Sequence, residues 1–336
     1  MSASDAVFLT GATGFVGAAV ARALIARGFR VRALVRAGSP RDNIAGLALE
    51  PVAGDLEDPA SLARGLAGCR YVFHLAADYR LWVPDPAAMM RVNVEGTRAL
   101  MRAAKEAGVA RIVYCSSVAA LGHTADRSPA DETTPVIESE IVGPYKRSKY
   151  LAEQAVLAMV REEGLPAVIV NPSTPVGPRD IKPTPTGRMI LDAAAGRMPG
   201  YLETGLNIVH VEDVAAGHLL ALARGVIGER YILGGQDLML GDLFAMTARL
   251  AGSRPPRLKL SEGVLWPVAL AAEGLARVFG IAPLVTREHL RMARKPMYFS
   301  SAKAVAELGY QPRPAADALA DAVAWFRASG KLRQAA

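Results

Sequence analysis

Short apolar runs alternate with longer amphipathic segments through the first half of the chain. The apolar runs predict buried strands, and apolar residues at helical spacing predict helices. The expected strands span residues 6–9, 30–35, 49–53, 71–75, 111–115 and 167–170, and the expected helices span 16–26, 59–66, 87–107 and 145–161. Strands that alternate with helices in this way predict βαβ units with right-handed crossovers. We therefore expect an α/β fold, a doubly wound parallel sheet with helices on both faces.

The pattern becomes less regular after Asn171. Several prolines interrupt the stretch that follows, and from Gly228 short segments alternate with proline and glycine. This change in the sequence pattern predicts a smaller second lobe at the C-terminal end. We expect the sheet domain to comprise residues 1–172 and 206–226, and the lobe to comprise residues 173–205 and 227–330.

The composition narrows the class of protein. With 336 residues, 51% hydrophobic and 21% charged, the chain is globular rather than disordered or fibrous. Its two cysteines form no Cys-x-x-Cys or Cys/His cluster, which predicts no disulfide framework and no metal site and favours a reducing compartment. The N-terminus lacks the features of a signal peptide, and no uncharged apolar stretch reaches the ~18 residues of a membrane span. We therefore expect a cytoplasmic protein.

The net charge of +7 is concentrated in the last quarter of the chain. Residues 249–336 contain 14 Lys and Arg against 6 Asp and Glu, a balance of +8, so residues 1–248 sum to −1. Two interpretations remain open, a solvated arginine-rich surface or attraction to an anionic substrate or membrane surface. No recognisable nucleic-acid-binding motif accompanies these residues, so we expect no nucleic-acid partner.

Three glycines follow the first predicted strand at a spacing typical of dinucleotide-binding loops. In TGATGFVG, residues 10–17, Gly11, Gly14 and Gly17 lie between a strand and a helix. Such a loop lets the backbone approach a pyrophosphate and directs a helix N-terminus at its negative charge. A structural turn alone would not need all three glycines, so the loop predicts a dinucleotide cofactor.

The residues after the next two strands bear on which dinucleotide binds. NAD sites usually place Asp or Glu after the second strand to bind the ribose hydroxyls, but this chain has Arg36. An arginine suits the 2′-phosphate of NADP(H), which we favour; a solvent-facing arginine, with NAD(H) as cofactor, is the alternative. Asp55, after the third strand, is a candidate acceptor for the adenine amino group, and it could also begin the next helix.

Ser117, Tyr145 and Lys149 have the spacing of a proton relay. Tyr145 and Lys149 are four residues apart and share one face of the expected helix, while Ser117 follows an expected strand. Lys149 can hold a nicotinamide ribose, and we expect its charge, together with that of the oxidised nicotinamide, to lower the pKa of Tyr145 from about 10 toward working pH. Ser117 can hydrogen-bond the substrate oxygen. Tyr145 would then transfer the proton that accompanies hydride transfer.

Taken together, these motifs resemble the extended short-chain dehydrogenase/reductase family along nearly the whole chain. The matching segments are TGATGFVG (10–17), GDL (54–56), HLAA (74–77), NVEGT (93–97), CSSVAALG (115–122), YKRSK (145–149), NPSTPVGP (171–178) and HVEDVAAGH (210–218). The resemblance implies a Rossmann domain for the cofactor, a lobe that closes over the substrate, and structural roles for His74 and Asn93. The expected cofactor contacts are Gly11, Thr13, Gly14, Phe15, Val16, Gly17, Arg36, Asp55, Leu56, Leu75, Ala76, Ala77, Asn93, Ser116, Tyr145, Lys149, Pro172 and Ser173.

Two branches of the family imply different reactions. NPSTPVGP and VRALVR (31–36) resemble dihydroflavonol reductases, which use NADPH, whereas UDP-sugar 4-epimerases carry asparagine where this chain has Thr174. Segments 207–222, 228–235 and 291–314 resemble the bacterial hopanoid-associated sugar epimerase. We expect reduction at a secondary alcohol or ketone carbon in hopanoid side-chain metabolism, with epimerisation through a retained cofactor, usually NAD, as the alternative. A non-enzymatic redox-sensing protein is a remote alternative, because such proteins commonly lose the Tyr/Lys pair.

The loop at residues 78–82 follows HLAA at the carboxyl edge of the expected sheet, where ligands gather. Tyr79 and Trp82 are therefore candidate substrate contacts, together with Ser117 and Thr174. An ordinary surface loop is the alternative. We expect a homodimer that acts on a small-molecule substrate.

Residues 261–280 are largely apolar, but Pro267, Glu273 and Arg277 make them a poor membrane span. They predict a helix buried in the lobe or at a subunit interface. The alternative is a helix that binds weakly at an anionic membrane surface, because cations flank it on both sides.

Overall fold

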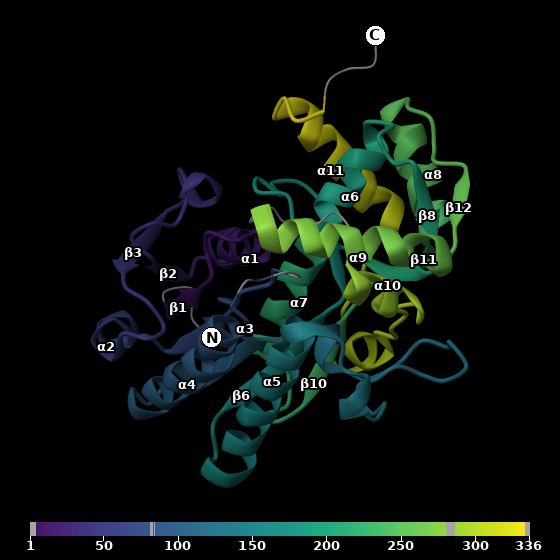
Figure 1. Ribbon diagram of the computed structural model, residues 1–336. Helices are drawn as coiled ribbons and strands as arrows, with labels where there is room; N and C mark the ends of the chain where they lie inside the picture. The colour runs from purple at the N-terminus through teal and green to yellow at the C-terminus, as the bar shows by residue number, and fades with distance from the viewer. Residues whose placement is uncertain (1–4, 81–82, 84, 280–285, 333–336) are drawn as a thin grey trace.

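A seven-stranded parallel sheet forms the centre of the molecule in the computed structural model, which describes residues 5–80, 83, 85–279 and 286–332 (Figure 1). Its strands, from edge to edge, are β10 (Arg230–Leu233), β6 (Ala167–Pro172), β5 (Arg111–Cys115), β4 (Tyr71–His74), β1 (Ala6–Thr10), β2 (Arg30–Val35) and β3 (Leu49–Ala53). The strand order reverses between β1 and β4. In doubly wound sheets, ligands bind in the crevice that such a reversal opens at the carboxyl ends of the strands.

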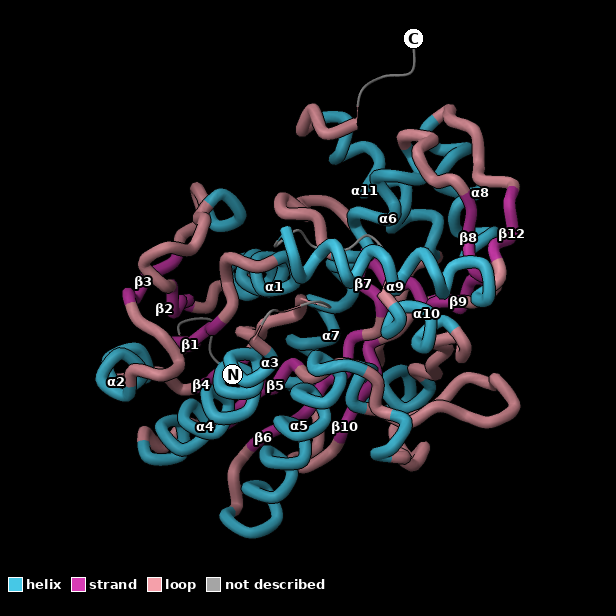
Figure 2. The backbone as a smooth tube through the Cα atoms, viewed as in Figure 1, coloured by secondary structure: helices cyan, strands magenta, loops and turns pink. Residues whose placement is uncertain are grey.

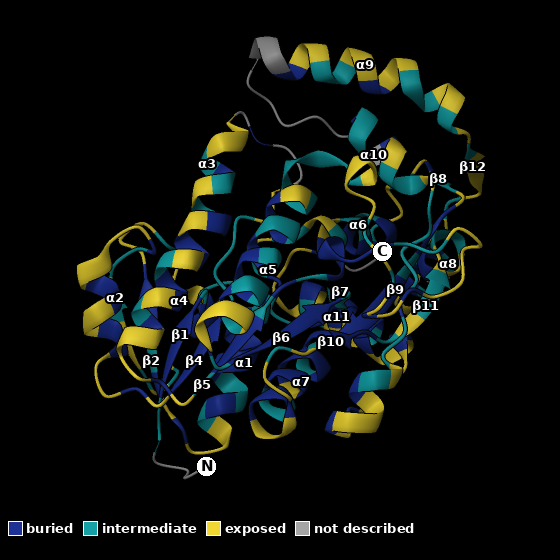
Figure 3. Ribbon diagram, turned by 90° about the horizontal axis from the view of Figure 1, so that it is seen from below, coloured by how far each residue is buried: buried dark blue, intermediate teal, exposed yellow. Residues whose placement is uncertain are grey.

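Burial along the strands follows their apolar pattern. All residues of β4 and β6 are buried, because helices cover both faces of the sheet (Figure 3). The edge strand β3 is mostly exposed and contains Pro51, which lacks an amide hydrogen and is tolerated at an edge.

Helices pack on both faces of the sheet, as Figures 1 and 2 show, which confirms the expected fold class. One face buries apolar residues of α1 (Phe15–Ala26) and α7 (Val211–Arg224); the other buries those of α2 (Pro59–Leu66), α4 (Gly96–Glu106) and α5 (Gly143–Glu163). The expected helix 87–107 is instead divided into α3 (Pro86–Met90), one wide π-helical turn η2 (Arg91–Glu95) and α4. Short 3₁₀ and π turns elsewhere are η1 (Asp42–Ile44), η3 (Val118–Ala120), η4 (Glu138–Glu140) and η5 (Ala304–Leu308).

The second lobe contains two small sheets and five helices among the described residues. One sheet has the order β11 (Gln236–Met239), β9 (Gly205–His210), β7 (Thr174–Val176), and the other pairs β12 (Leu258–Leu260) with β8 (Gly200–Leu202). The helices are α6 (Pro185–Ala194), α8 (Leu240–Ala251), α9 (Glu262–Phe279), α10 (Arg287–Ala293) and α11 (Ala315–Ala328). Residues of α6, α8 and α11 share one apolar core.

Two strands lie on the other side of the boundary expected from the sequence. β10, which we placed in the lobe, pairs with β6 and completes the large sheet, whereas β9, which we placed in the sheet domain, pairs with β7 and β11 in the lobe. Both strands are short and buried, so their apolar pattern suits either sheet. The crossover through α7 decides their places, because it leads the chain from the lobe back to the edge of the large sheet.

Candidate active site

The glycine-rich loop follows β1 at the strand reversal and is too tight for side chains. Gly11 has φ +77°, and a Cβ there would lie 2.7 Å from the Ala76 nitrogen in the loop after β4. A Cβ on Gly17 would lie 2.0 Å from the Gly11 carbonyl oxygen. Gly14 donates its N–H to the same carbonyl at 3.0 Å and begins α1. The glycines thus bring the N-terminus of α1 against the loops at the carboxyl edge.

The first turn of α1 fits an anionic ligand. Gly14 offers no side-chain cap and the turn contains no acidic residue, so its backbone N–H groups are not capped by its own side chains. Such N–H groups and the helix dipole favour a pyrophosphate. Thr13, Phe15 and Val16 lie in this loop and turn; the Thr13 carbonyl accepts a hydrogen bond from Asn43 at 3.2 Å, which ties the loop to η1.

Arg36 and Asp55 lie after neighbouring strands at the adenosine end of this site. Arg36 is exposed directly after β2. Its charge acts on Asp78: burial alone would raise the pKa of that carboxyl, but hydrogen bonds from Arg80 and the charges of Arg80 and Arg36 lower it. Asp55 Oδ1 accepts from the Glu57 amide at 3.1 Å, so this carboxylate takes part in the turn before α2, and Leu56 beside it is buried.

A buried chain of hydrogen bonds supports the loop after β4. Thr97 Oγ1 donates its proton to the Asn93 carbonyl at 2.7 Å, so toward His74 Nε2, 2.8 Å away, it can only accept. His74 therefore carries its proton on Nε2 and accepts from Thr10 Oγ1 at Nδ1, 2.7 Å away. Burial, and then the charge of Lys149, lowers the pKa of His74 to about 3, which agrees with a neutral ring.

Asn93 connects this chain to α5. Its Oδ1 accepts from the Asp78 amide at 2.7 Å, and its Nδ2 donates to the Asp78 carbonyl at 2.8 Å and to Ser148 Oγ at 2.9 Å. Ser148 Oγ donates in turn to the Tyr145 carbonyl at 2.8 Å. The loop that contains Leu75, Ala76 and Ala77 is thereby held against the first turns of α5.

Ser117, Tyr145 and Lys149 come together beside this loop. A hydrogen bond joins the Ser117 and Tyr145 side chains. Lys149 is buried, donates from Nζ to the Cys115 carbonyl at 2.9 Å, and lies 5.1 Å from the centre of the Tyr114 ring. The ends of β5 and the start of α5 therefore position the three expected catalytic groups together, with Ser116 buried next to them.

The chain's own groups raise the pKa of Tyr145. Burial raises it to about 12, and the hydrogen bond with Ser117 only partly offsets this. Desolvation of the phenolate thus outweighs the effects within the chain that favour it, and the expected lowering, which includes the charge of an oxidised nicotinamide, stays a prediction. Burial also lowers the pKa of Lys149.

Asn171 and Glu153 support Ser117 from behind. Asn171 Nδ2 donates to the Ser117 carbonyl at 3.0 Å and to Glu153 Oε2 at 2.7 Å. Glu153 is fully buried, and its other oxygen lies 3.4 Å from Arg230 Nη1. The sequence interpretation missed this carboxylate. It could have been recognised as a charged residue one turn after Lys149, on the side of the helix where small and apolar residues predict burial. Thr10, Thr97 and Ser148 were also missed, although they lie within or next to the recognised motifs.

The end of β6 and the residues that follow it supply the other expected contacts of the site. Pro172 ends β6, and the Ser173 amide donates to the Leu233 carbonyl at 3.2 Å. The Ser173 hydroxyl is buried and has no hydrogen-bond partner among the described residues, which suits a nearby polar ligand group. Thr174 begins β7 and is half-buried.

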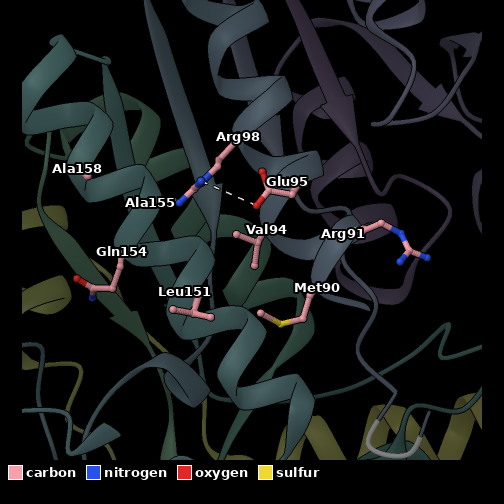
Figure 4. Close-up of a pocket in the computed structure, with 9 residues that line it drawn as sticks. All are labelled: Met90, Arg91, Val94, Glu95, Arg98, Leu151, Gln154, Ala155 and Ala158. Carbon is pink, nitrogen blue, oxygen red and sulfur yellow. Dashed lines mark ion pairs between the residues drawn. The ribbon is translucent and has the colours of Figure 1, made fainter. Parts of the chain in front are cut away.

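Of the two loop residues expected at the substrate, Tyr79 is 41% exposed, and Trp82 lies outside the described residues. A separate groove lies between α3, η2 and α4 on one side and α5 on the other (Figure 4). It is lined by Met90, Arg91, Val94, Glu95, Arg98, Leu151, Gln154, Ala155 and Ala158. None of the expected catalytic residues lines this groove.

Known proteins resemble this chain over nearly its full length. The NAD dependent epimerase/dehydratase family matches residues 7–234. A Synechocystis protein named "Putative dihydroflavonol 4-reductase" is 44% identical over 98% of this chain and 97% of its own. Sterol demethylase protein B of Methylococcus capsulatus is 37% identical over 96% of this chain and 99% of its own. The crystal structure of gox2253 is 65% identical with a TM-score of 0.89, covering 98% of this chain and 100% of that one.

Fold and site together define an oxidoreductase-type enzyme of the extended short-chain dehydrogenase/reductase class, with a nicotinamide dinucleotide as cofactor. The chain belongs to the NAD dependent epimerase/dehydratase family. The resemblance stated from its motifs is thereby confirmed.

Proposed function

We propose that the chain is an NADP(H)-dependent reductase that acts at a ketone or secondary alcohol carbon of an apolar polycyclic substrate of the hopanoid class. The observation that carries the reaction is the convergence of Ser117, Tyr145 and Lys149 beside the loop after β4, which packs against Gly11 of the glycine-rich loop.

Ser117, Tyr145 and Lys149 each have a separate role in the proposed reaction. A bound nicotinamide supplies or accepts the hydride at the substrate carbon. Ser117 Oγ holds the substrate oxygen, and Tyr145 Oη transfers a proton to it during reduction. Because the pKa of Tyr145 is raised to about 12, its hydroxyl stays protonated at neutral pH, which favours proton donation to a ketone. Lys149 presents a buried ammonium one helical turn away, where it would hold the nicotinamide ribose.

NADP(H) is proposed from the position of Arg36. Its exposed guanidinium follows β2, next to the strand that ends in the glycine-rich loop, where the adenosine ribose binds in doubly wound sheets. A guanidinium can bind a 2′-phosphate through two hydrogen bonds but has no matching partner in a ribose diol.

The substrate class is proposed from the relatives and the motifs. The name of the Methylococcus relative assigns it to sterol demethylation, and sterols and hopanoids share an apolar polycyclic skeleton. The segments that resemble the hopanoid-associated sugar epimerase support the same class of substrate. Tyr79, Trp82, Ser117 and Thr174 are the proposed substrate contacts.

Epimerisation is the second candidate, because the family that matches includes epimerases. An epimerase oxidises and then re-reduces its substrate and so keeps its cofactor bound. Thr174 argues against a nucleotide-sugar substrate, since it occupies the position of the asparagine that grips the diphosphate in UDP-sugar epimerases.

Identification of the cofactor on the purified protein separates the two candidates. We expect exchangeable NADP(H) and NADPH oxidation on addition of a hopanoid ketone, with one alcohol formed per NADPH consumed. Tightly retained NAD, together with interconversion of two epimers and no net NADPH consumption, would show epimerisation instead.

A further inference from the structure

Helix α9 has its apolar side turned to solvent. Val264, Val268, Leu270 and Leu275 are 63%, 52%, 53% and 58% exposed. The exposed residues among positions 262–276, which we name the α9 face, are Gly263, Val264, Pro267, Val268, Leu270, Ala271, Gly274 and Leu275. At ~100° per residue these eight positions fall within one arc of ~160°. A surface helix normally presents polar residues there.

The carboxylates of α9 point the other way. Glu262 forms an ion pair with Arg294 at 2.6 Å, and Glu273 forms one with Arg287 at 2.8 Å and also accepts the Arg287 amide at 2.7 Å. Residues 262–276 contain no lysine or arginine. The polar side of the helix thus faces the segment around α10, and neither carboxylate adds an unpaired negative charge beside the α9 face.

Exposed cations precede α9 in the chain, and one lies beside it. Arg254 and Arg257 are exposed shortly before the helix, and the guanidinium of Arg291 lies 5.9 Å from the centre of the Trp266 ring. Leu258, on β12 shortly before the helix, is 62% exposed. An apolar helix face with cations and an aromatic ring nearby is suited to the headgroup region of an anionic bilayer.

A second copy of the chain fits this face less well. A helix of 18 residues is ~27 Å long, so its exposed side supplies a patch of a few hundred Å², whereas stable dimers bury about 800 Å² on each partner. No described helix is long and apolar enough to cross a membrane, so contact would be peripheral.

Helix α10 connects α9 with the start of the active-site helix α5. α10 packs against α9 and lies between it and the start of α5 (Figure 3). A Cβ on Gly143, two residues before Tyr145, would lie 2.9 Å from Glu288 Oε2 of α10. A lipid surface bound to the α9 face would therefore be separated by α9 and α10 from the helix that carries the catalytic tyrosine.

We propose that the α9 face docks on an anionic lipid surface, with Val264, Val268, Leu270 and Leu275 entering the headgroup region. Docking there would bring the substrate lobe to the bilayer in which an apolar polycyclic substrate dissolves. The docking is argued from α9 itself; only this role in reaching the substrate rests on the proposed function.

Co-sedimentation of the full chain with vesicles tests the docking. We expect binding to vesicles of phosphatidylcholine and phosphatidylglycerol at about 50 mM salt, and at least tenfold weaker binding at about 500 mM salt or with phosphatidylcholine alone. Val268→Glu with Leu275→Glu should lower the partition coefficient at least tenfold. Val226→Glu with Ile227→Glu, which charges exposed apolar residues outside α9, is the matched control and should leave it unchanged.

Three results would overturn the docking proposal. The first is the absence of sedimentation at low salt, and the second is equal sedimentation of the Val268→Glu/Leu275→Glu variant. The third is a change of that variant's molar mass in solution with unaltered vesicle binding, which would assign the face to a second copy. Equal melting temperatures of variant and parent exclude unfolding as the cause. Vesicle binding needs no turnover, so failure of the proposed reaction leaves this test intact.

Discussion

Lys149 is buried and Tyr145 is half-buried, and their side chains have different tasks. Lys149 is anchored through the Cys115 carbonyl, 2.9 Å from Nζ, whereas Tyr145 shares a hydrogen bond with Ser117 at the place where a substrate oxygen would bind. The contact with Cys115 orients the ammonium that would hold the cofactor, and the contact with Ser117 orients the hydroxyl that would transfer a proton.

Tyr145→Phe should therefore separate chemistry from binding. We expect kcat to fall by about 10²–10⁴-fold, the usual contribution of a general acid, while the dissociation constant of the cofactor stays within about twofold. Steady-state turnover and fluorescence titration of the cofactor measure the two quantities. Lys149→Ala should impair both, and a Tyr145→Phe enzyme at nearly the parent rate would remove this hydroxyl from the mechanism.

Arg36 controls cofactor choice in our proposal, so Arg36→Asp should reverse it. The carboxylate would repel a 2′-phosphate and accept from the ribose hydroxyls. We expect the parent to bind NADPH more tightly than NADH and the variant to show the opposite order in titrations. Arg30→Asp, at the other end of β2, makes the same charge change and should leave the order intact. Equal affinities in the parent would refute the role of Arg36.

At the scale of elements, Asp180 links the chain after β7 to α6. It is 2% exposed, and its carboxylate accepts from the Thr184 amide and from Thr184 Oγ1 at 2.8 Å, where Thr184 caps α6. Burial raises the pKa of Asp180 to about 6 despite these hydrogen bonds. The folded state therefore binds this proton more tightly than the unfolded state does.

A raised carboxyl pKa makes stability fall as pH rises. Between about pH 4 and pH 6 the folded protein retains a proton that the unfolded chain has lost, so the free energy of unfolding should decrease by up to about 3 kcal/mol relative to Asp180→Asn. Above about pH 6 the difference between parent and variant should stay constant. Chemical denaturation of both proteins across this range measures it, and a flat difference would contradict the raised pKa.

The sequence predicted elements where one pattern has one structural solution. The apolar spacing predicts the strands of the large sheet and the helices that pack on it. The three glycines predict a tight loop, and the structure confirms it: Gly11 has a positive φ, and Gly17 has no room for a Cβ. β9 and β10 were placed in the wrong lobes because a short buried strand fits any sheet, and only the crossover through α7 decides its partner.

In the site, too, features within one element can be predicted from the sequence, whereas contacts between elements cannot. The Tyr145–Lys149 spacing is a helical turn and can be read from the sequence. The buried pair of Asn171 and Glu153 behind Ser117 joins residues from β6 and α5, so it depends on how those elements pack. The pKa of Tyr145 could not be predicted for the same reason, since burial is set by the whole surroundings.

At the scale of the molecule, the expected homodimer needs a surface distinct from the α9 face. We expect it at the groove between α5 and the segment α3–η2–α4, whose lining combines apolar and small residues with Arg91, Glu95, Arg98 and Gln154 (Figure 4). A groove with charges of both signs and apolar side chains can match a copy of itself related by a twofold axis.

Ala158→Arg tests this arrangement, because it places a bulky charge in the groove while Ala158 is only half-buried in the isolated chain. We expect the parent to have the molar mass of a dimer by light scattering and the variant that of a monomer, with Ala158→Ser as the size-matched control. Vesicle binding through α9 should persist in each protomer, although two protomers on one surface bind more tightly than one. A parent that is monomeric, or a dimer unaffected by Ala158→Arg, would show that the groove is not the dimer interface.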